Sequence, residues 1–129
     1  MAGVSALLDT SVLIASSPID PSLLANGWVV SVVSIGELEA GVLIASDPHV
    51  RAARLRRLVA ILAESPVLPV DRQVADRYGE LRAATGRLPS NDLWIAATAL
   101  AHGFTLLSAD ERQAKLPLVQ TRLVMDPAL

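Results

Sequence analysis

A short segment near the N-terminus restricts the possible folds of this chain more than any other, because an apolar run there ends on a carboxylate. Residues 4–8 are long enough for one buried strand, and residues 11–15 have the pattern of a short helix. Asp9 therefore lies at the carboxyl end of a strand, where open α/β sheets form their ligand sites. A short polar residue also caps a following helix well, so this position alone leaves a structural and a chemical role open.

The rest of the chain repeats this alternation of strand-like and helical patterns. Further strands are predicted at residues 28–33, 67–70, 104–108 and 119–125. Pro69 places the strand at residues 67–70 at an edge or an end of the sheet. Helices are predicted at residues 34–46, 48–64, 72–85 (with Asp71 as the cap) and 90–101, with one more turn at 20–25. This order predicts an α/β fold in which helices flank a mostly parallel central sheet, in three layers.

The predicted helix at residues 48–64 has two distinct faces. Four apolar residues at helical spacing predict its buried stripe: Leu55, Leu58, Val59 and Leu62. Three basic residues lie together on another face, with Arg56 nearby: Arg51, Arg54 and Arg57. Such a basic face is either simply solvated or a surface that contacts phosphate or a partner, and both interpretations stay open.

Three more acids follow predicted strands or open predicted helices. Glu37 lies three residues after Ser34, and this capping-box spacing explains the acid without any chemistry. Asp92 lies in the first turn of an almost entirely apolar helix, so we expect it to enter a crowded interior. Asp110 follows a strand directly, as Asp9 does, although Ser108 and Glu111 repeat the capping-box spacing.

The strand order brings four acids to one edge of the sheet: Asp9, Glu37, Asp92 and Asp110. Carboxylates so close together repel and raise one another's pKa unless a cation joins them. Hard oxygen ligands of this kind select Mg²⁺ or Mn²⁺. The pattern therefore predicts a divalent metal site.

Composition excludes several other classes of site. The chain has 129 residues and no cysteine, which predicts one domain over residues 1–129 without disulfides or a cysteine-based zinc or redox centre. Neither GxGxxG nor GxxxxGK[ST] nor GxSxG occurs, so dinucleotide, Walker-type and nucleophile-elbow sites are absent. The net charge of -2 does not exclude RNA, because with four of the 13 acids in a metal site the 11 basic residues outnumber the remaining acids.

The apolar content bears on location and partners. No signal peptide pattern and no uninterrupted apolar stretch of membrane-spanning length occurs, so we expect a cytoplasmic protein without a membrane partner. Apolar residues make up 52% of this small chain, which predicts that a second copy or a partner covers some of them. The helix at residues 34–46 carries apolar side chains on more than one face, a pattern that fits the groove for an amphipathic partner helix: Ile35, Leu38, Val42, Leu43 and Ile44.

Four segments together resemble the acidic motifs of PIN-domain ribonucleases, and in order, spacing and chain length they resemble the VapC toxins of bacterial type II toxin–antitoxin pairs. These segments are residues 8–14, 34–38, 91–99 and 105–110, so the resemblance spans nearly the whole chain. Each motif is weak alone, but the ordered set is specific.

The resemblance implies a PIN-like fold, a homodimer, a cognate VapB-like antitoxin, and hydrolysis of RNA phosphodiester bonds with Mg²⁺, for which Mn²⁺ can substitute. It makes Asp9, Glu37, Asp92 and Asp110 the catalytic and metal-binding residues, with Ser11 and Ser108 in support. Glu111 departs from the commoner pattern, which leaves open whether it shares the role of Asp110.

Two alternatives remain at the level of sequence. A non-catalytic PIN-like module would bind RNA or protein without cutting, although all four acids are present. A receiver-like signalling domain also gathers acids around Mg²⁺, but it needs a partner lysine, and the only lysine, Lys115, lies in a late helix.

Overall fold

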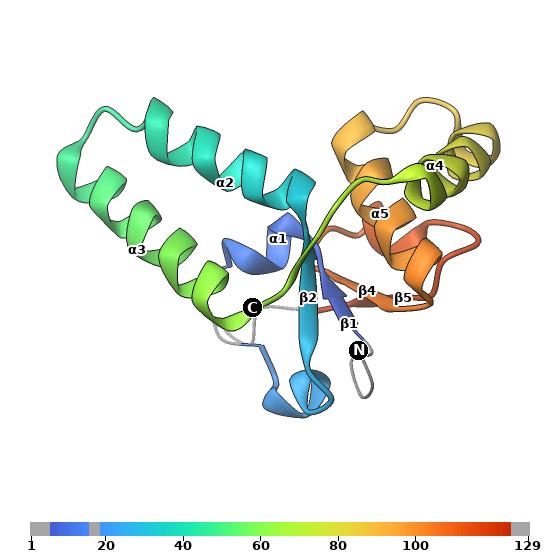
Figure 1. The fold of residues 1–129 in the computed structure, drawn as a ribbon, viewed down its shortest axis with the longest axis horizontal. Coiled ribbons are helices and arrows are strands. Elements are labelled where there is room, and N and C mark those ends of the chain that lie inside the picture. The colour runs from blue at the N-terminus through green and yellow to red at the C-terminus, as the bar shows by residue number, and fades with distance from the viewer. Residues whose placement is uncertain (1–5, 16–18, 125–129) are drawn as a thin grey trace.

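A computed structural model describes residues 6–15 and 19–124 (Figure 1). Within these residues one five-stranded sheet has the order β3-β2-β1-β4-β5, and each of its neighbouring pairs is parallel. The strands are β1 (Ala6–Leu8), β2 (Trp28–Ser31), β3 (Val67–Leu68), β4 (Thr105–Ser108) and β5 (Thr121–Leu123). The predicted parallel α/β sheet is confirmed, with β3 at an edge as its proline indicated.

Helices connect the strands and lie on both sides of the sheet (Figure 1). They are α1 (Thr10–Leu13), α2 (Val32–Ile44), α3 (Pro48–Glu64), α4 (Arg72–Thr85) and α5 (Ser90–His102). Two single 3-10 turns, η1 (Pro21–Leu24) and η2 (Gln113–Lys115), complete the described elements. In Figure 1, α2 and α3 form a hairpin on one side of the sheet, and α4 and α5 form a pair on the other.

Each face of the sheet has its own apolar core, because successive side chains of a strand point to opposite faces. Leu7, Val29 and Leu106 pack with α4 and α5 residues such as Leu81 and Leu93. Ala6, Leu8, Val30 and Leu107 pack on the other face with α1 and α3 residues, Leu13 and Ile61. The central strands β1, β2 and β4 are therefore buried on both faces, as a parallel sheet between two helical layers requires.

The strand β2 ends at Ser31, two residues earlier than predicted, and α2 therefore begins two residues earlier, at Val32. Residues 32 and 33 belong to the helix, and the hydroxyl of Ser31 caps it by accepting the Val33 N–H at 3.1 Å. The capping box predicted for Ser34 and Glu37 is therefore wrong. The β-branched residues Val32 and Val33 favour a strand locally, but tertiary packing overrides that preference. Parts of the first and last predicted strands and residues 16–18 lie outside the described residues.

The helix at residues 48–64 has the predicted bounds, but of its four predicted stripe residues only Leu58 is buried. Leu58 is 2% exposed and Ile61 is 7% exposed, whereas Leu55, Val59 and Leu62 are 47%, 57% and 46% exposed. The α3 helix packs at the outside of its layer, so only a narrow stripe reaches the core. Its outer apolar side chains are left on the surface.

Two leucines of α3 should differ in how much they contribute to stability, because Leu58 is buried and Leu62 is partly exposed. Leu58→Ala is expected to lower the free energy of unfolding by about 2–5 kcal/mol, because it removes buried methylenes and leaves a cavity. Leu62→Ala, the matched control, is expected to change it by less than about 1 kcal/mol because its side chain is largely exposed. Urea unfolding of both variants measures these free energies. Equal losses of stability would mean that Leu62 belongs to the buried stripe, as the sequence predicted.

In the part of the chain that the structure describes, no helix has the length and apolar character needed to cross a bilayer.

Candidate active site at the carboxyl edge of the sheet

Asp9 ends the central strand β1 and is only 4% exposed. Its Oδ2 atom accepts two hydroxyl hydrogen bonds, from Ser11 at 2.6 Å and from Ser108 at 3.0 Å. Although Asp9 occupies the position before α1, its side chain makes no capping hydrogen bond. The interpretation of Asp9 as a simple helix cap is therefore wrong, and its carboxylate is buried and held by hydroxyls instead.

The two serines also join the ends of β1 and β4. Ser108 Oγ accepts the Asp110 N–H at 3.0 Å, and Ser11 Oγ accepts the Ala109 N–H at 2.9 Å. Ser108 is fully buried, whereas the bond between Ala109 and Ser11 is exposed to solvent. Its capping-box pairing with Glu111 does not form, because the Ser108 oxygen accepts the Asp110 N–H and no helix begins at this position.

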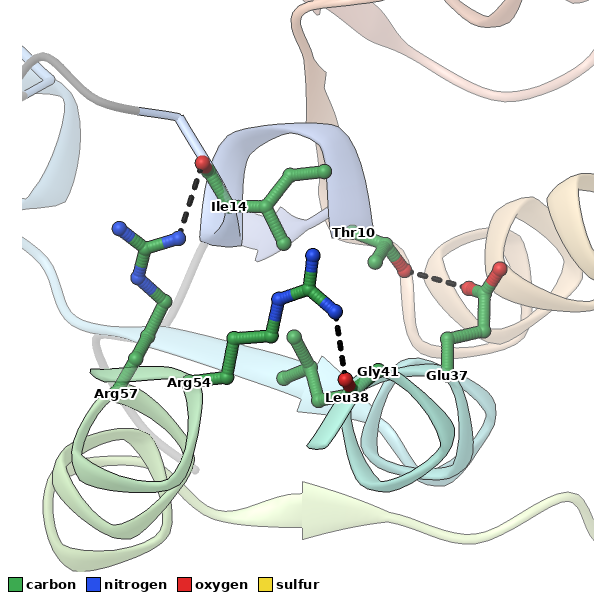
Figure 2. A pocket seen from close by; sticks show the side chains of 7 residues that line it. All are labelled: Thr10, Ile14, Glu37, Leu38, Gly41, Arg54 and Arg57. Atoms are coloured by element: carbon green, nitrogen blue, oxygen red, sulfur yellow. Dashed lines mark hydrogen bonds between the residues drawn. The ribbon is translucent and has the colours of Figure 1, made fainter. Parts of the chain in front are cut away.

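Glu37 lies on α2 and is fixed by a hydroxyl that the sequence interpretation did not single out. Thr10 Oγ1 donates to Glu37 Oε1 at 2.7 Å (Figure 2). The same Thr10 oxygen lies 2.7 Å from Ser34 Oγ. Because Thr10 has one hydroxyl proton, which goes to Glu37, Ser34 is the donor in this second bond. Glu37 is thus held by α1, and Ser34 supports that contact rather than capping a helix.

Asp92 lies in the first turn of α5 and is half-buried. Burial raises the pKa of its carboxyl group, and the nearby carboxylates of Asp9, Asp110 and Glu37 raise it further. Arg112 opposes this shift as the smallest of these influences. The carboxylates of Asp9, Asp110 and Glu37 are therefore near enough to Asp92 to act on its charge.

The start of α5 is anchored from two sides. Gln113, only 2% exposed, donates from its Nε2 to the Asp92 backbone oxygen at 2.7 Å. On the other side, Arg82 of α4 donates to the backbone oxygens of Gly86 and Leu88 and to Ser90 Oγ, at 2.6, 2.8 and 3.2 Å. These contacts fix the loop before α5 and hence the position of Asp92.

Asp110 differs from Asp92 in its partners. Its carboxylate accepts the Arg112 N–H at 2.9 Å and lies 3.3 Å from the Arg112 guanidinium. Burial acts to raise the pKa of Asp110, but the hydrogen bonds and the charge of Arg112 outweigh it, so the pKa falls below its ordinary value. Among the four acids, Asp110 is therefore the one whose negative charge is partly neutralised by an arginine.

The donor chemistry of this edge suits a hard divalent cation, because the four side chains supply only carboxylate oxygens. Across residues 6–15 and 19–124, however, no three acidic or histidine side chains are already close enough to share one ion. The residue types, and the repulsion that raises the pKa of Asp92, fit a bound cation.

Ser108→Ala is expected to destabilise the protein, because it leaves the Asp110 N–H without its partner and removes one of the two hydroxyl hydrogen bonds to the buried Asp9 Oδ2. Loss of such buried hydrogen bonds costs about 1–3 kcal/mol, which lowers the melting temperature by about 4 °C per kcal/mol for a chain of this size. The exposed Ser46 supplies the control, Ser46→Ala. A melting temperature equal to that of the control would show that the hydroxyl bridge is unimportant.

The chain is similar to known proteins over most of its length. Residues 6–118 match the PIN domain family. The chain is 43% identical over 122 residues to Ribonuclease VapC4 of Mycobacterium tuberculosis, covering 89% of this chain and 93% of that protein. It is 38% identical over 117 residues to Ribonuclease VapC5 of the same organism, covering 85% and 86%.

Similarity to solved structures agrees with this. The crystal structure of VapBC-5 from Mycobacterium tuberculosis, a member of the VapBC family of toxin–antitoxin systems, contains a chain with a TM-score of 0.80 and 34% sequence identity. The match covers 95% of this chain and 98% of that chain.

Proposed function

This chain belongs to the PIN-domain family, and we propose that it is a VapC-type endoribonuclease, the toxin of a toxin–antitoxin pair, acting at the acidic edge of its sheet. The observation that carries the proposal is the buried Asp9 carboxylate, which is held by two serines and which, with Asp110 and Glu37, acts on the charge of Asp92. The family assignment excludes the receiver-like alternative. The reaction is hydrolysis of an RNA phosphodiester.

The proposed cofactor is Mg²⁺, for which Mn²⁺ substitutes, and Asp9 and Asp92 are its proposed direct ligands. When bound, a divalent cation lowers the pKa of water and stabilises charge that develops on a phosphoryl group. Glu37 and Asp110 complete the set, either directly or through water. The proposal includes all four acids because Asp9 and Asp110 follow the parallel strands β1 and β4, and Glu37 and Asp92 lie near the starts of α2 and α5.

The residues around the acids restrict how each carboxylate is presented. Ser11 and Ser108 both bind Oδ2 of Asp9, which leaves its other oxygen without a hydrogen bond among the described residues. Thr10 fixes Oε1 of Glu37. Prior orientation of this kind lowers the entropy lost when substrate and cation bind.

The test is cleavage of RNA by the purified protein. Single-stranded RNA labelled at its 5′ end should be cut internally in the presence of Mg²⁺ or Mn²⁺, and EDTA should stop the reaction. Sequencing of cellular RNA ends after brief induction would then identify the substrate. Cleavage that continues undiminished in EDTA would contradict the metal-dependent mechanism.

The exposed apolar residues of the α2–α3 hairpin support the proposed protein partner. Leu43 and Ile44 at the end of α2 are 70% and 78% exposed, and the outer face of α3 is apolar as well. We propose that an amphipathic helix of a VapB-like antitoxin covers this surface, and that the toxin itself is a homodimer. Failure of the adjacent upstream gene's product to bind would contradict the first part, and sedimentation as a monomer at micromolar concentration would contradict the second.

A further inference from the structure

A pocket of about 410 Å³ lies directly beside the acidic site, between α1, α2 and α3. Figure 2 shows the side chains around it. Its lining residues are Thr10, Ile14, Glu37, Leu38, Gly41, Arg54 and Arg57. Thr10 and Glu37 belong to the acidic site, whereas Arg54 and Arg57 come from the basic face of α3. The pocket therefore joins an acidic centre to a pair of cations.

Both arginines are held in place through backbone oxygens of other helices. Arg54 Nη1 donates to the Gly41 oxygen at 2.7 Å, and Arg57 Nη1 donates to the Ile14 oxygen at 3.0 Å (Figure 2). A guanidinium has five N–H groups, so each arginine keeps several donors after this contact. Among the described residues, neither arginine forms an ion pair with a carboxylate. In this part of the chain, one backbone contact therefore orients each guanidinium and leaves its charge without a carboxylate partner.

We propose that Arg54 and Arg57 bind a phosphodiester of the RNA substrate next to the one that is cut. This inference rests on the proposed ribonuclease function, and it assigns the pocket as a substrate-binding subsite. Four carboxylates repel a polyanion, so a substrate that reaches them needs cationic contacts at their border. The planar guanidinium matches a phosphate with two parallel hydrogen bonds, which makes arginine suited to this task.

The other lining residues agree with a nucleotide as the occupant. Ile14 and Leu38 give the pocket an apolar surface between the two arginines and the acidic site. An apolar surface of this kind suits the sugar or base that accompanies a bound phosphate. Arg56 lies on the same helix but does not line the pocket and is exposed, so it serves as an internal control.

The first arm of the experiment measures RNA affinity without cleavage. Fluorescence anisotropy with labelled single-stranded RNA is measured in the Asp92→Asn background, with Mg²⁺ present. Arg54→Gln and Arg57→Gln should each raise Kd about tenfold, the effect of losing one hydrogen bond to a charged group. Each should also reduce the slope of log affinity against log salt by about 0.7, the value per phosphate contact of a single strand. Arg56→Gln should leave Kd within about twofold, as substitution outside a contact does.

The second arm leaves both arginines and their backbone contacts intact. Gly41 lies on α2 within the pocket lining, and a Cβ atom at this position would meet no atom within 4 Å. Gly41→Glu therefore adds a carboxylate to the pocket lining with no clash at its Cβ atom. It should weaken RNA binding as the arginine variants do. Gly79→Glu is the matched control, because Gly79 lies on α4 outside the pocket and is equally open. In cleavage assays, Gly41→Glu should raise KM much more than it lowers kcat.

The two arms separate failure of this inference from failure of the proposed function. If Arg54→Gln, Arg57→Gln and Gly41→Glu bind RNA like their controls while Asp9→Asn abolishes cleavage, the inference is overturned and the pocket is left to a protein partner. If the arginine variants melt at a lower temperature than wild type, their weaker RNA binding could reflect partial unfolding. The inference then depends on whether Gly41→Glu binds RNA more weakly than Gly79→Glu. If Asp9→Asn cleaves RNA as fast as wild type, the proposed function itself fails.

Discussion

Asp9→Asn is expected to lower the rate of RNA cleavage by about a thousandfold or more, because several kcal/mol of transition-state stabilisation depend on the cation that this carboxylate holds. Asn has nearly the same shape as Asp, and its oxygen still accepts hydrogen bonds from Ser11 and Ser108. The substitution therefore removes the charge with little change of packing. Initial rates on one labelled RNA, with Mg²⁺ in excess, provide the measurement.

Glu37→Gln and Asp92→Asn should show losses of similar size, since they belong to the same proposed ligand set. The matched control is Glu39→Gln, because Glu39 is exposed and lies two residues from Glu37 on the same helix. The control should cut at the wild-type rate. If all three acid variants cleave RNA at the wild-type rate, the acidic edge of the sheet is not the active site.

Addition of Mn²⁺ or Mg²⁺ to the metal-free protein is expected to raise its melting temperature by roughly 10 °C. A ligand that binds only the folded state contributes about 2.7 kcal/mol at 100 times its Kd, and each kcal/mol shifts the midpoint by about 4 °C for a chain of this size. Thermal melts in EDTA and in a series of metal concentrations give the result. A wild-type protein that is insensitive to both ions would remove the main support for a metal site.

Asp92→Asn should melt at a higher temperature than wild type in EDTA at neutral pH. Burial and neighbouring carboxylates raise the pKa of Asp92 above its ordinary value, so its ionised form destabilises the folded state at any pH above the folded pKa. This penalty fades as the pH falls through the folded pKa, because the folded protein then takes up the proton. The advantage of Asp92→Asn should therefore disappear on acidification, and the variant should gain little from added metal.

Asp9→Asn should not share this gain. The Asp9 carboxylate accepts two short hydroxyl hydrogen bonds, and bonds to a charged acceptor are stronger than bonds to a neutral amide. The difference between the two variants in EDTA thus separates a carboxylate stabilised by hydroxyls from one that is mainly repelled. A loss of stability in Asp92→Asn would indicate that it serves only to stabilise the start of α5.

The positions of the acids could be predicted from sequence, because apolar runs locate the strands and the carboxyl ends of parallel strands meet at one edge. The hydroxyl groups that bind these acids depend on contacts between residues far apart in the chain. Ser108 reaches Asp9 only because β1 and β4 pair in parallel with Leu8 opposite Leu107. No local pattern encodes that register, and the contact of Gln113 with the Asp92 backbone has no sequence signal either.

The wrong predictions also have a common physical cause. Residues 32 and 33 and the apolar stripe of α3 were interpreted from local preference and spacing, whereas their true state depends on which neighbours cover them. The α3 arginines show the same limit. Sequence placed Arg54 and Arg57 on one face, but only the fold shows that they line a pocket beside Glu37.

The hydrogen bond between Ser108 and Asp9 joins residues 99 positions apart in the chain. At ribosomal speeds of about 5–20 residues per second, Ser108 is synthesised roughly 5–20 s after Asp9. Until β4 has formed, the central strand β1 has β2 as its partner but lacks its other neighbour. A nascent chain therefore holds no complete set of the four acids until β4 and Asp110 have been made. If these acids form the active site as proposed, a product that is truncated before β4 should have no nuclease activity.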